Sequence, residues 1–150
     1  MFGKEGEGIV INGIVAVMLA VETVSDLRTK TVSAARLAVF TAGAVAANIV
    51  LYYQPVWSML GGMAVGALLF AYAFATGEGI GYGDCFVFVC AGAYIGLHEN
   101  IRLLFFSLLA ALAVGGIRAV IHKGSMKSRV PFVPCILGVY TVMTAVKIIS

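Results

Sequence analysis

The chain has 150 residues, of which 61% are hydrophobic and 11% are charged, and its mean hydropathy is +1.03. A soluble domain of this length could not bury so much apolar surface, so the composition excludes a water-soluble fold and predicts a membrane protein. The net charge of +3 does not indicate a nucleic-acid partner, because the basic residues do not gather in one patch with interleaved aromatics.

Hydropathy divides a single expected domain, residues 1–150, into six apolar segments. They run from about Gly8 to Val24, Ala34 to Tyr53, Val56 to Ala75, Asp84 to about Leu97, Ile101 to Ile121 and Pro131 to Ile149. A helix needs about 20 residues to cross a bilayer, so the fourth segment is short. We therefore expect an all-α, polytopic membrane protein with about six transmembrane helices. Small residues around Gly62 and around Gly116 are expected to let neighbouring helices pack closely.

The distribution of Lys and Arg predicts the orientation of these segments. With the N-terminus outside, seven of the ten basic residues lie at the inner face and three at the outer face. The inner set is Arg28, Lys30, Arg36, Arg118, Lys123, Lys127 and Arg129, and the outer set is Lys4, Arg102 and Lys147. Cytoplasmic loops are richer in Lys and Arg than outer ones, so the sequence predicts a multi-pass protein of the cell membrane with its N-terminus outside. The inner basic residues are expected to meet anionic membrane lipid.

Two aspartates stand at the ends of apolar segments. Asp26 follows the first segment, and Asp84 closes the motif Gly81-Tyr82-Gly83-Asp84 just before the fourth. An even number of crossings separates them, so both carboxylates are expected at the cytoplasmic face. Such a pair can hydrolyse a peptide: one carboxylate takes a proton from water, and the other, protonated, polarises the scissile carbonyl and protonates the leaving amine.

The remaining polar residues allow more than one interpretation. Gly81 and Gly83 permit backbone conformations that admit an extended peptide, or else they form an ordinary turn. Glu22, one turn before Asp26, faces the same cavity or pairs with a basic residue, and the pairing is favoured.

Three further groups are expected to have structural roles. Asn48 is expected to bridge helices, and His98 and Glu99 are expected in an outer loop. Neither His98 nor His122 has a partner at metal-ligand spacing, and the three cysteines fit no such spacing either. The sequence therefore predicts no metal and no other cofactor.

Three motifs in order resemble those of the type IV prepilin peptidase family, the GxGD class of intramembrane aspartyl proteases. The motifs are Asp26-Leu27-Arg28-Thr29-Lys30, Gly81-Tyr82-Gly83-Asp84 and Pro131-Phe132-Val133-Pro134. The resemblance implies that Asp26 and Asp84 are the catalytic pair and that Gly81 and Gly83 support the site. It implies a substrate with a short basic leader before a hydrophobic helix, a type IV prepilin or pilin-like precursor, cut at the cytoplasmic face.

The chain departs from the family pattern at several points. Phe86 stands where members often have lysine, and Val32-Ser33 where they often have isoleucine-proline. The inserted cytoplasmic domain of the larger members has no counterpart here, so the resemblance implies a peptidase that does not methylate the new N-terminus. A preflagellin-type peptidase is the alternative within the family. A small proton- or ion-pathway subunit and a purely structural subunit are the alternatives outside it.

Overall fold

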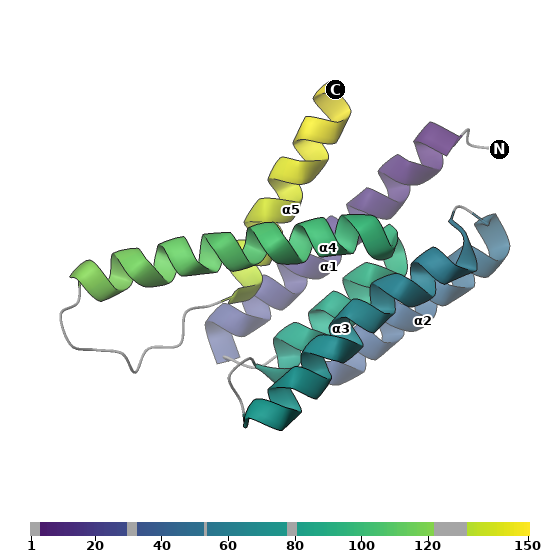
Figure 1. The fold of residues 1–150 in the computed structure, drawn as a ribbon. Coiled ribbons are helices and arrows are strands. Elements are labelled where there is room, and N and C mark those ends of the chain that lie inside the picture. The colour runs from purple at the N-terminus through teal and green to yellow at the C-terminus, as the bar shows by residue number, and fades with distance from the viewer. Residues whose placement is uncertain (1–3, 30–32, 53, 78–80, 122–131) are drawn as a thin grey trace.

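The computed structural model of the chain describes residues 4–29, 33–52, 54–77, 81–121 and 132–150, and the regular structure within them is entirely helical. The five helices in these ranges are α1 (Lys4–Thr29), α2 (Ala34–Leu51), α3 (Val56–Thr76), α4 (Tyr82–Ile121) and α5 (Phe132–Ile149) (Figure 1). Each is long and apolar enough to cross a membrane. The prediction of an all-α polytopic membrane fold is confirmed. Lys30, the segment 78–80, the basic loop with His122, and Pro131 lie outside the described residues.

Local sequence explains where the middle helices begin and end. Ser33 has an extended conformation, and its hydroxyl accepts a hydrogen bond from the Arg36 amide, which caps the first turn of α2. Tyr52, in the left-handed region with φ 47°, ends α2 by donating its amide to the Asn48 carbonyl. Pro55 precedes α3, and Gly77, with φ 66°, caps its C-terminus. These local signals therefore fix where α2 and α3 begin and end.

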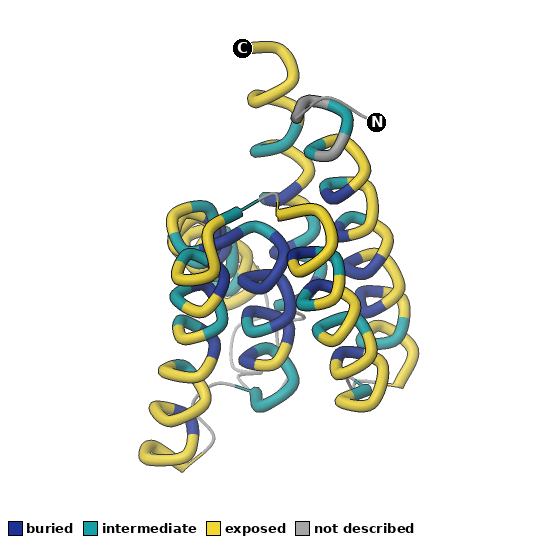
Figure 2. Tube along the Cα trace, turned by 90° about the vertical axis from the view of Figure 1, so that its right-hand side faces the viewer, coloured by how far each residue is buried: buried dark blue, intermediate teal, exposed yellow. Residues whose placement is uncertain are grey.

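The first half of α4 stands in the centre of the bundle. Buried residues follow one another along it, including Val87, Phe88, Cys90 and Tyr94, whereas the surrounding helices bury one stripe each (Figure 2). The outward faces of the other helices carry large apolar side chains. In α2, α3 and α5 these include Val39, Leu68, Phe74 and Val142. Lipid is the environment in which such faces are stable, since there apolar surface need not be hidden inside the protein.

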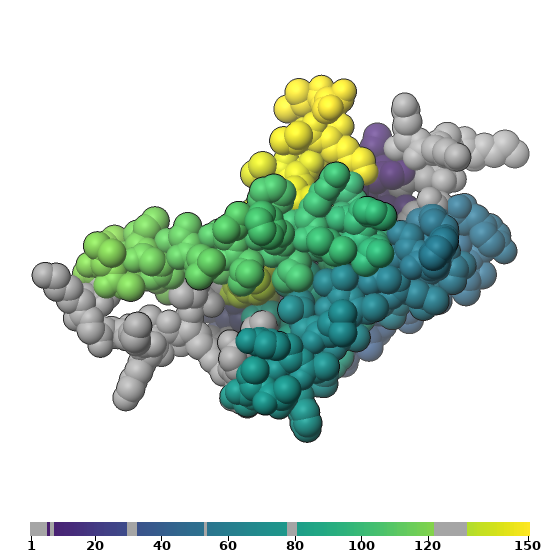
Figure 3. All heavy atoms as spheres, viewed as in Figure 1, coloured from purple at the N-terminus to yellow at the C-terminus, as the bar shows by residue number. Residues whose placement is uncertain are grey.

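Helix α3 makes the most extensive contact with α4, and glycines allow it. A Cβ atom at Gly62 would overlap the backbone of Gly92, and one at Gly92 would overlap the carbonyl of Gly62. One turn along, Gly66 lies against Val89. The prediction of a close-packing face around Gly62 is confirmed. At Gly116, in contrast, a Cβ would meet nothing within 4 Å among the described residues, and that part of α4 extends beyond the packed body (Figure 3), so the described structure does not bear out the prediction at this glycine.

Helix α4 is sharply kinked at Gly96, whose φ of 81° and ψ of −178° are not helical. The kink interrupts the ladder between the Ala93 carbonyl and the Leu97 amide. Gln54 Nε2 donates to the Ala93 oxygen at 2.8 Å, and the Leu97 amide donates to Ser58 Oγ at 3.3 Å. Side chains from the α2–α3 connection and the start of α3 therefore replace the lost helical hydrogen bond, which a membrane interior would otherwise leave unsatisfied.

Asn100 shows how far the chain turns at this kink. Its Nδ2 donates to the Phe88 carbonyl at 3.1 Å and to the Gly62 carbonyl at 2.8 Å. In a straight helix, residues 88 and 100 would be about 18 Å apart along the axis. The second half of α4 therefore folds back against the first before it leaves the bundle.

The structure gives five helices where six segments were expected, because the fourth and fifth apolar segments join directly at Gly96 as the two halves of the kinked helix α4. The residues expected in a loop between them, His98 and Glu99, lie in α4 just after the kink. Hydropathy falls at these two polar residues, but the helical backbone continues through them. The chain breaks its helical geometry two residues earlier, at the glycine.

Candidate active site

Asp84 lies in the first turn of α4. The Gly81 carbonyl accepts hydrogen bonds from the amides of Asp84 at 3.1 Å and Cys85 at 3.4 Å, which starts the helix. The Asp84 side chain is half-buried, and its position near the helix N-terminus favours a negative charge. A Cβ at Gly81 would lie 3.2 Å from Asp84 Oδ2, so glycine leaves the space that this carboxylate uses.

Aromatic contacts hold the start of α4 against α3. The ring of Phe70 lies 5.3 Å from that of Tyr82 and 5.4 Å from that of Phe86, centroid to centroid. Tyr82 stands between the two motif glycines, Gly81 and Gly83. The Tyr82 ring therefore ties the motif to α3, while Gly81 leaves room for the Asp84 carboxylate.

Asp26 lies in the last turn of α1 and is half-buried. The sequence placed the end of the first segment at about Val24, which is too early, since α1 continues to Thr29. The Thr29 hydroxyl donates to the Ser25 carbonyl at 2.8 Å and satisfies an oxygen in this last turn. Asp26 is thus carried by a helix rather than by the connection that follows it.

A polar cluster adjoins Asp26. Glu22, one turn earlier on α1, is fully buried. Arg36 of α2 donates two hydrogen bonds to its carboxylate, Nε to Oε1 at 3.0 Å and Nη2 to Oε2 at 3.4 Å. The same Nη2 donates to Ser25 Oγ at 2.7 Å. The prediction that Glu22 pairs with a basic residue is confirmed, and Arg36, which the sequence analysis used only for orientation, is the partner.

Helix α1 runs antiparallel to the first half of α4 (Figure 1). The two helices meet where Cys90 Sγ lies 3.1 Å from Met18 Sδ. Asp26 lies eight residues after Met18, about 12 Å along α1, and Asp84 six residues before Cys90, about 9 Å along α4. Because the helices are antiparallel, both displacements lead to the same end of the bundle. The two aspartates therefore lie at the same end and at nearly the same level.

The third motif approaches the same region. The ring of Phe132, at the start of α5, lies 6.1 Å from the ring of Phe88, which is one turn beyond Asp84 in α4. Further along α5, Tyr140 donates to Asn12 Oδ1 of α1 at 3.1 Å. Helix α5 is therefore fixed to both aspartate-bearing helices, α1 and α4.

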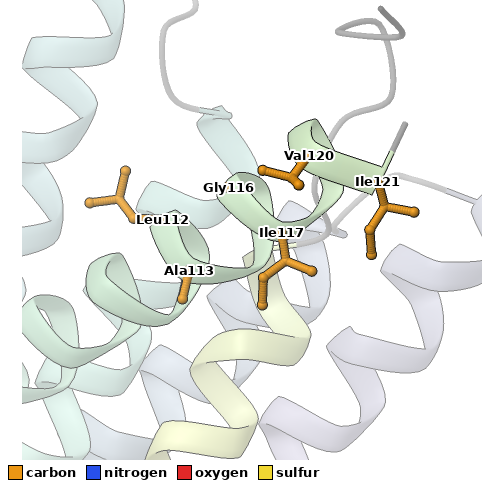
Figure 4. Close-up of a pocket in the computed structure, with 6 residues that line it drawn as sticks. All are labelled: Leu112, Ala113, Gly116, Ile117, Val120 and Ile121. Atoms are coloured by element: carbon orange, nitrogen blue, oxygen red, sulfur yellow. The ribbon is translucent and has the colours of Figure 1, made fainter. Parts of the chain in front are cut away.

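The remaining candidates lie elsewhere. Asn48 bridges α2 and α3, as predicted, with its Nδ2 3.5 Å from Met59 Sδ. An apolar hollow of about 430 Å³ lies along the far end of α4, lined by Leu112, Ala113, Gly116, Ile117, Val120 and Ile121 (Figure 4). Its lining offers no polar group for chemistry. Within the described ranges, no three His, Cys, Asp or Glu side chains gather closely enough to hold a metal ion.

Sequence reasoning did not find Gln54, Ser58 and Gly96 as a unit, since the kink joins residues that are far apart in the chain. A glutamine before a proline at the end of an apolar segment was the available signal. The Glu22–Arg36 pair has a clearer signal in the sequence, because a carboxylate inside an apolar segment requires a cationic partner.

The fold and the site define a polytopic membrane protein with two carboxylates at one end of its helix bundle. The model of the type IV leader peptidase family matches residues 13–117, more than two thirds of the chain. The chain therefore belongs to the type IV leader peptidase family and is a membrane peptidase. The matched range includes both aspartates and ends before α5. Comparisons with curated proteins and with solved structures find no match.

Proposed function

We propose that the chain, as one transmembrane peptidase domain of residues 1–150, is an aspartyl endopeptidase whose catalytic pair is Asp26 and Asp84. The observation that carries this proposal is the antiparallel packing of α1 on α4 at Met18 and Cys90, which brings both carboxylates to one end of the bundle. Membership of the type IV leader peptidase family supports the reaction class.

Hydrolysis by this pair needs one ionised and one protonated carboxyl group. Two carboxylates within a few ångström of each other cannot both ionise easily, so the pair shares one proton. The ionised group takes a proton from the attacking water, and the protonated group hydrogen-bonds the scissile carbonyl. The water oxygen bonds to the carbonyl carbon, and a proton held by the pair then passes to the nitrogen of the leaving amine as the carbon–nitrogen bond breaks.

The proposed substrate is a type IV prepilin or pilin-like precursor, in which a short basic leader precedes a hydrophobic helix. Arg28 and Arg36, which lie near Asp26, agree with the inner-face excess of Lys and Arg predicted from the sequence, and this supports cleavage at the cytoplasmic face. The peptide must be extended there, since a helix engages its own carbonyls in hydrogen bonds. The proposed activity is leader removal alone, without N-methylation of the new N-terminus.

Co-expression with a pilin-like precursor tests the proposal. The wild-type chain is expected to shorten the precursor by its leader, and Asp26→Asn and Asp84→Asn are each expected to abolish the shortening. Both variants keep the side-chain shape and remove the acid–base function. A shortened product that persists in either variant would contradict the proposed pair. A preflagellin in place of the prepilin distinguishes the two substrate subclasses.

A further inference from the structure

We propose that Arg36 is a positioning residue for Asp26, acting through Glu22 and Ser25 of the same helix. The inference rests on the proposed function of Asp26 and Asp84. The role proposed for Arg36 is to hold the turn that carries Asp26, and it includes no contact with the reacting water or the peptide.

The buried carboxylate of Glu22 fixes how α1 faces α2. It is fully buried within a span, where an unpaired charge is costly, and the guanidinium of Arg36 meets both of its oxygens. A planar fork of this kind fixes the angle as well as the distance between two groups. The pair therefore sets the rotation of α1 about its own axis relative to α2, which a single point contact would not do.

Arg36 also holds the last turn of α1 through Ser25. Arg36 Nη2 lies 2.7 Å from Ser25 Oγ, and Ser25 directly precedes Asp26. Helix ends fray, because their last carbonyls lack helical partners. Asp26 lies in the last turn of α1, so one guanidinium holds the residue before it and the residue one turn earlier. A buried ion pair needs only the Glu22 contact, whereas the Ser25 contact restrains the turn that carries Asp26.

Arg36 is also connected, through α2, to α4. The Arg36 backbone is fixed by the Ser33 cap at the start of α2. One turn further along α2, the Phe40 carbonyl accepts a hydrogen bond of 2.8 Å from the hydroxyl of Tyr94 in α4. The turn of Asp26 is thereby linked through Arg36 and α2 to the helix that bears Asp84. A loss of this link is expected to separate the carboxylates without removing either.

The test measures kcat and KM on purified, full-length protein, with the precursor that the wild-type chain cleaves. Arg36→Met is expected to lower kcat on the order of tenfold to a hundredfold per folded molecule, with KM changed by less than about twofold. Arg102→Met is the matched control, since it removes an arginine from an exposed pair with Glu99 at 3.7 Å and is expected to leave both constants unchanged.

Three further variants separate positioning from stability, and they keep the test decisive if Arg36→Met does not fold. Ser25→Ala leaves the ion pair in place and is expected to lower kcat at an unchanged melting temperature. Arg36→Lys keeps the charge but not the fork, so its kcat is expected to lie between those of wild type and Arg36→Met. Arg36→Met leaves the buried Glu22 carboxylate without its partner. The double variant Glu22→Met/Arg36→Met removes this carboxylate as well, so it is expected to recover the wild-type melting temperature but not the wild-type kcat.

A double variant with wild-type kcat would overturn the inference, because the pair would then only stabilise the fold. Wild-type kcat in both Ser25→Ala and Arg36→Lys would also overturn it. Wild-type cleavage by Asp26→Asn or Asp84→Asn would instead overturn the proposed function. The two failures are therefore distinguishable in one series of variants.

Discussion

The sulfur atoms of Met18 and Cys90 lie 3.1 Å apart, and this contact fixes the level at which α1 passes the central helix α4. Asp26 and Asp84 lie beyond it, each in the end turn of its helix. A displacement of α1 by one turn, about 5.4 Å, would move Asp26 out of level with Asp84. The register of α1 on α4 is therefore the structural condition for the proposed chemistry.

This register predicts a specific disulfide. In a background of Cys85→Ala and Cys135→Ala, Met18→Cys is expected to form a disulfide with Cys90 on oxidation in the membrane. Loss of thiol labelling, read by mass spectrometry, measures its formation. Val17→Cys is the matched control, since Val17 is the preceding residue and its side chain is 59% exposed. Equal yields from positions 17 and 18 would contradict the register.

The glycine contact between α3 and α4 predicts a large loss of stability from one methyl group. Gly92→Ala places a Cβ against the Gly62 carbonyl and the Asn100 side chain, which cannot both move away. The free energy of unfolding is expected to fall by about 1–3 kcal/mol, the usual cost of overpacking. Gly116→Ala, where a Cβ meets open space, is expected to be neutral or slightly stabilising. Thermal unfolding in detergent compares the two, and equal melting temperatures would refute the contact.

The kink in α4 predicts a measurable distance. Spin labels at Phe86 and Leu112, both exposed and on opposite sides of Gly96, would be about 39 Å apart along a straight helix. The folded protein is expected to give a clearly shorter distance by pulsed electron resonance. Gly96→Ala strains a backbone with φ 81° at a cost of about 1–3 kcal/mol, so it is expected to lengthen this distance or to destabilise the protein. A wild-type distance near 39 Å would contradict the kink.

The space beside Asp84 predicts a kinetic effect of a small substitution. Gly81→Ala places a Cβ 3.2 Å from Asp84 Oδ2, so the carboxylate must shift by a few tenths of an ångström. Turnover is expected to fall severalfold to about tenfold, while the amount of inserted protein stays the same. Gly138→Ala, with nothing within 4 Å of its Cβ, is the control. Wild-type turnover in Gly81→Ala would show that the glycine is not needed to place the carboxylate.

Hydropathy was sufficient to predict the helices that begin and end at strong local signals. Helix α2 begins at Ala34 as expected, because Ser33 caps it, and α3 begins at Val56, because Pro55 precedes it. Hydropathy misplaced the end of α1, because the helical backbone continues through charged residues there. Asp26 and Arg28 lie inside α1, since a charge near a helix end does not break the hydrogen-bond ladder.

The kink and the ion pair show what the sequence could not supply. Gly96 breaks α4 two residues before hydropathy falls, and its compensating partners, Gln54 and Ser58, are more than thirty-five residues away. The partner of Glu22 could be predicted as a class, a cation, but not as Arg36. Tertiary packing decides which cation pairs with Glu22. The order of the two aspartate motifs, in contrast, could be read directly from the sequence.

The joint action of the two aspartates is tested most directly by a double-variant cycle of cleavage rates on purified protein. Asp26→Asn, Asp84→Asn and the double variant are compared with wild type at equal amounts of folded enzyme. Residues that act as one unit are not additive, so each single variant is expected to lose about as much activity as the double. A single variant that retains wild-type turnover, or losses that multiply independently in the double variant, would contradict the paired mechanism.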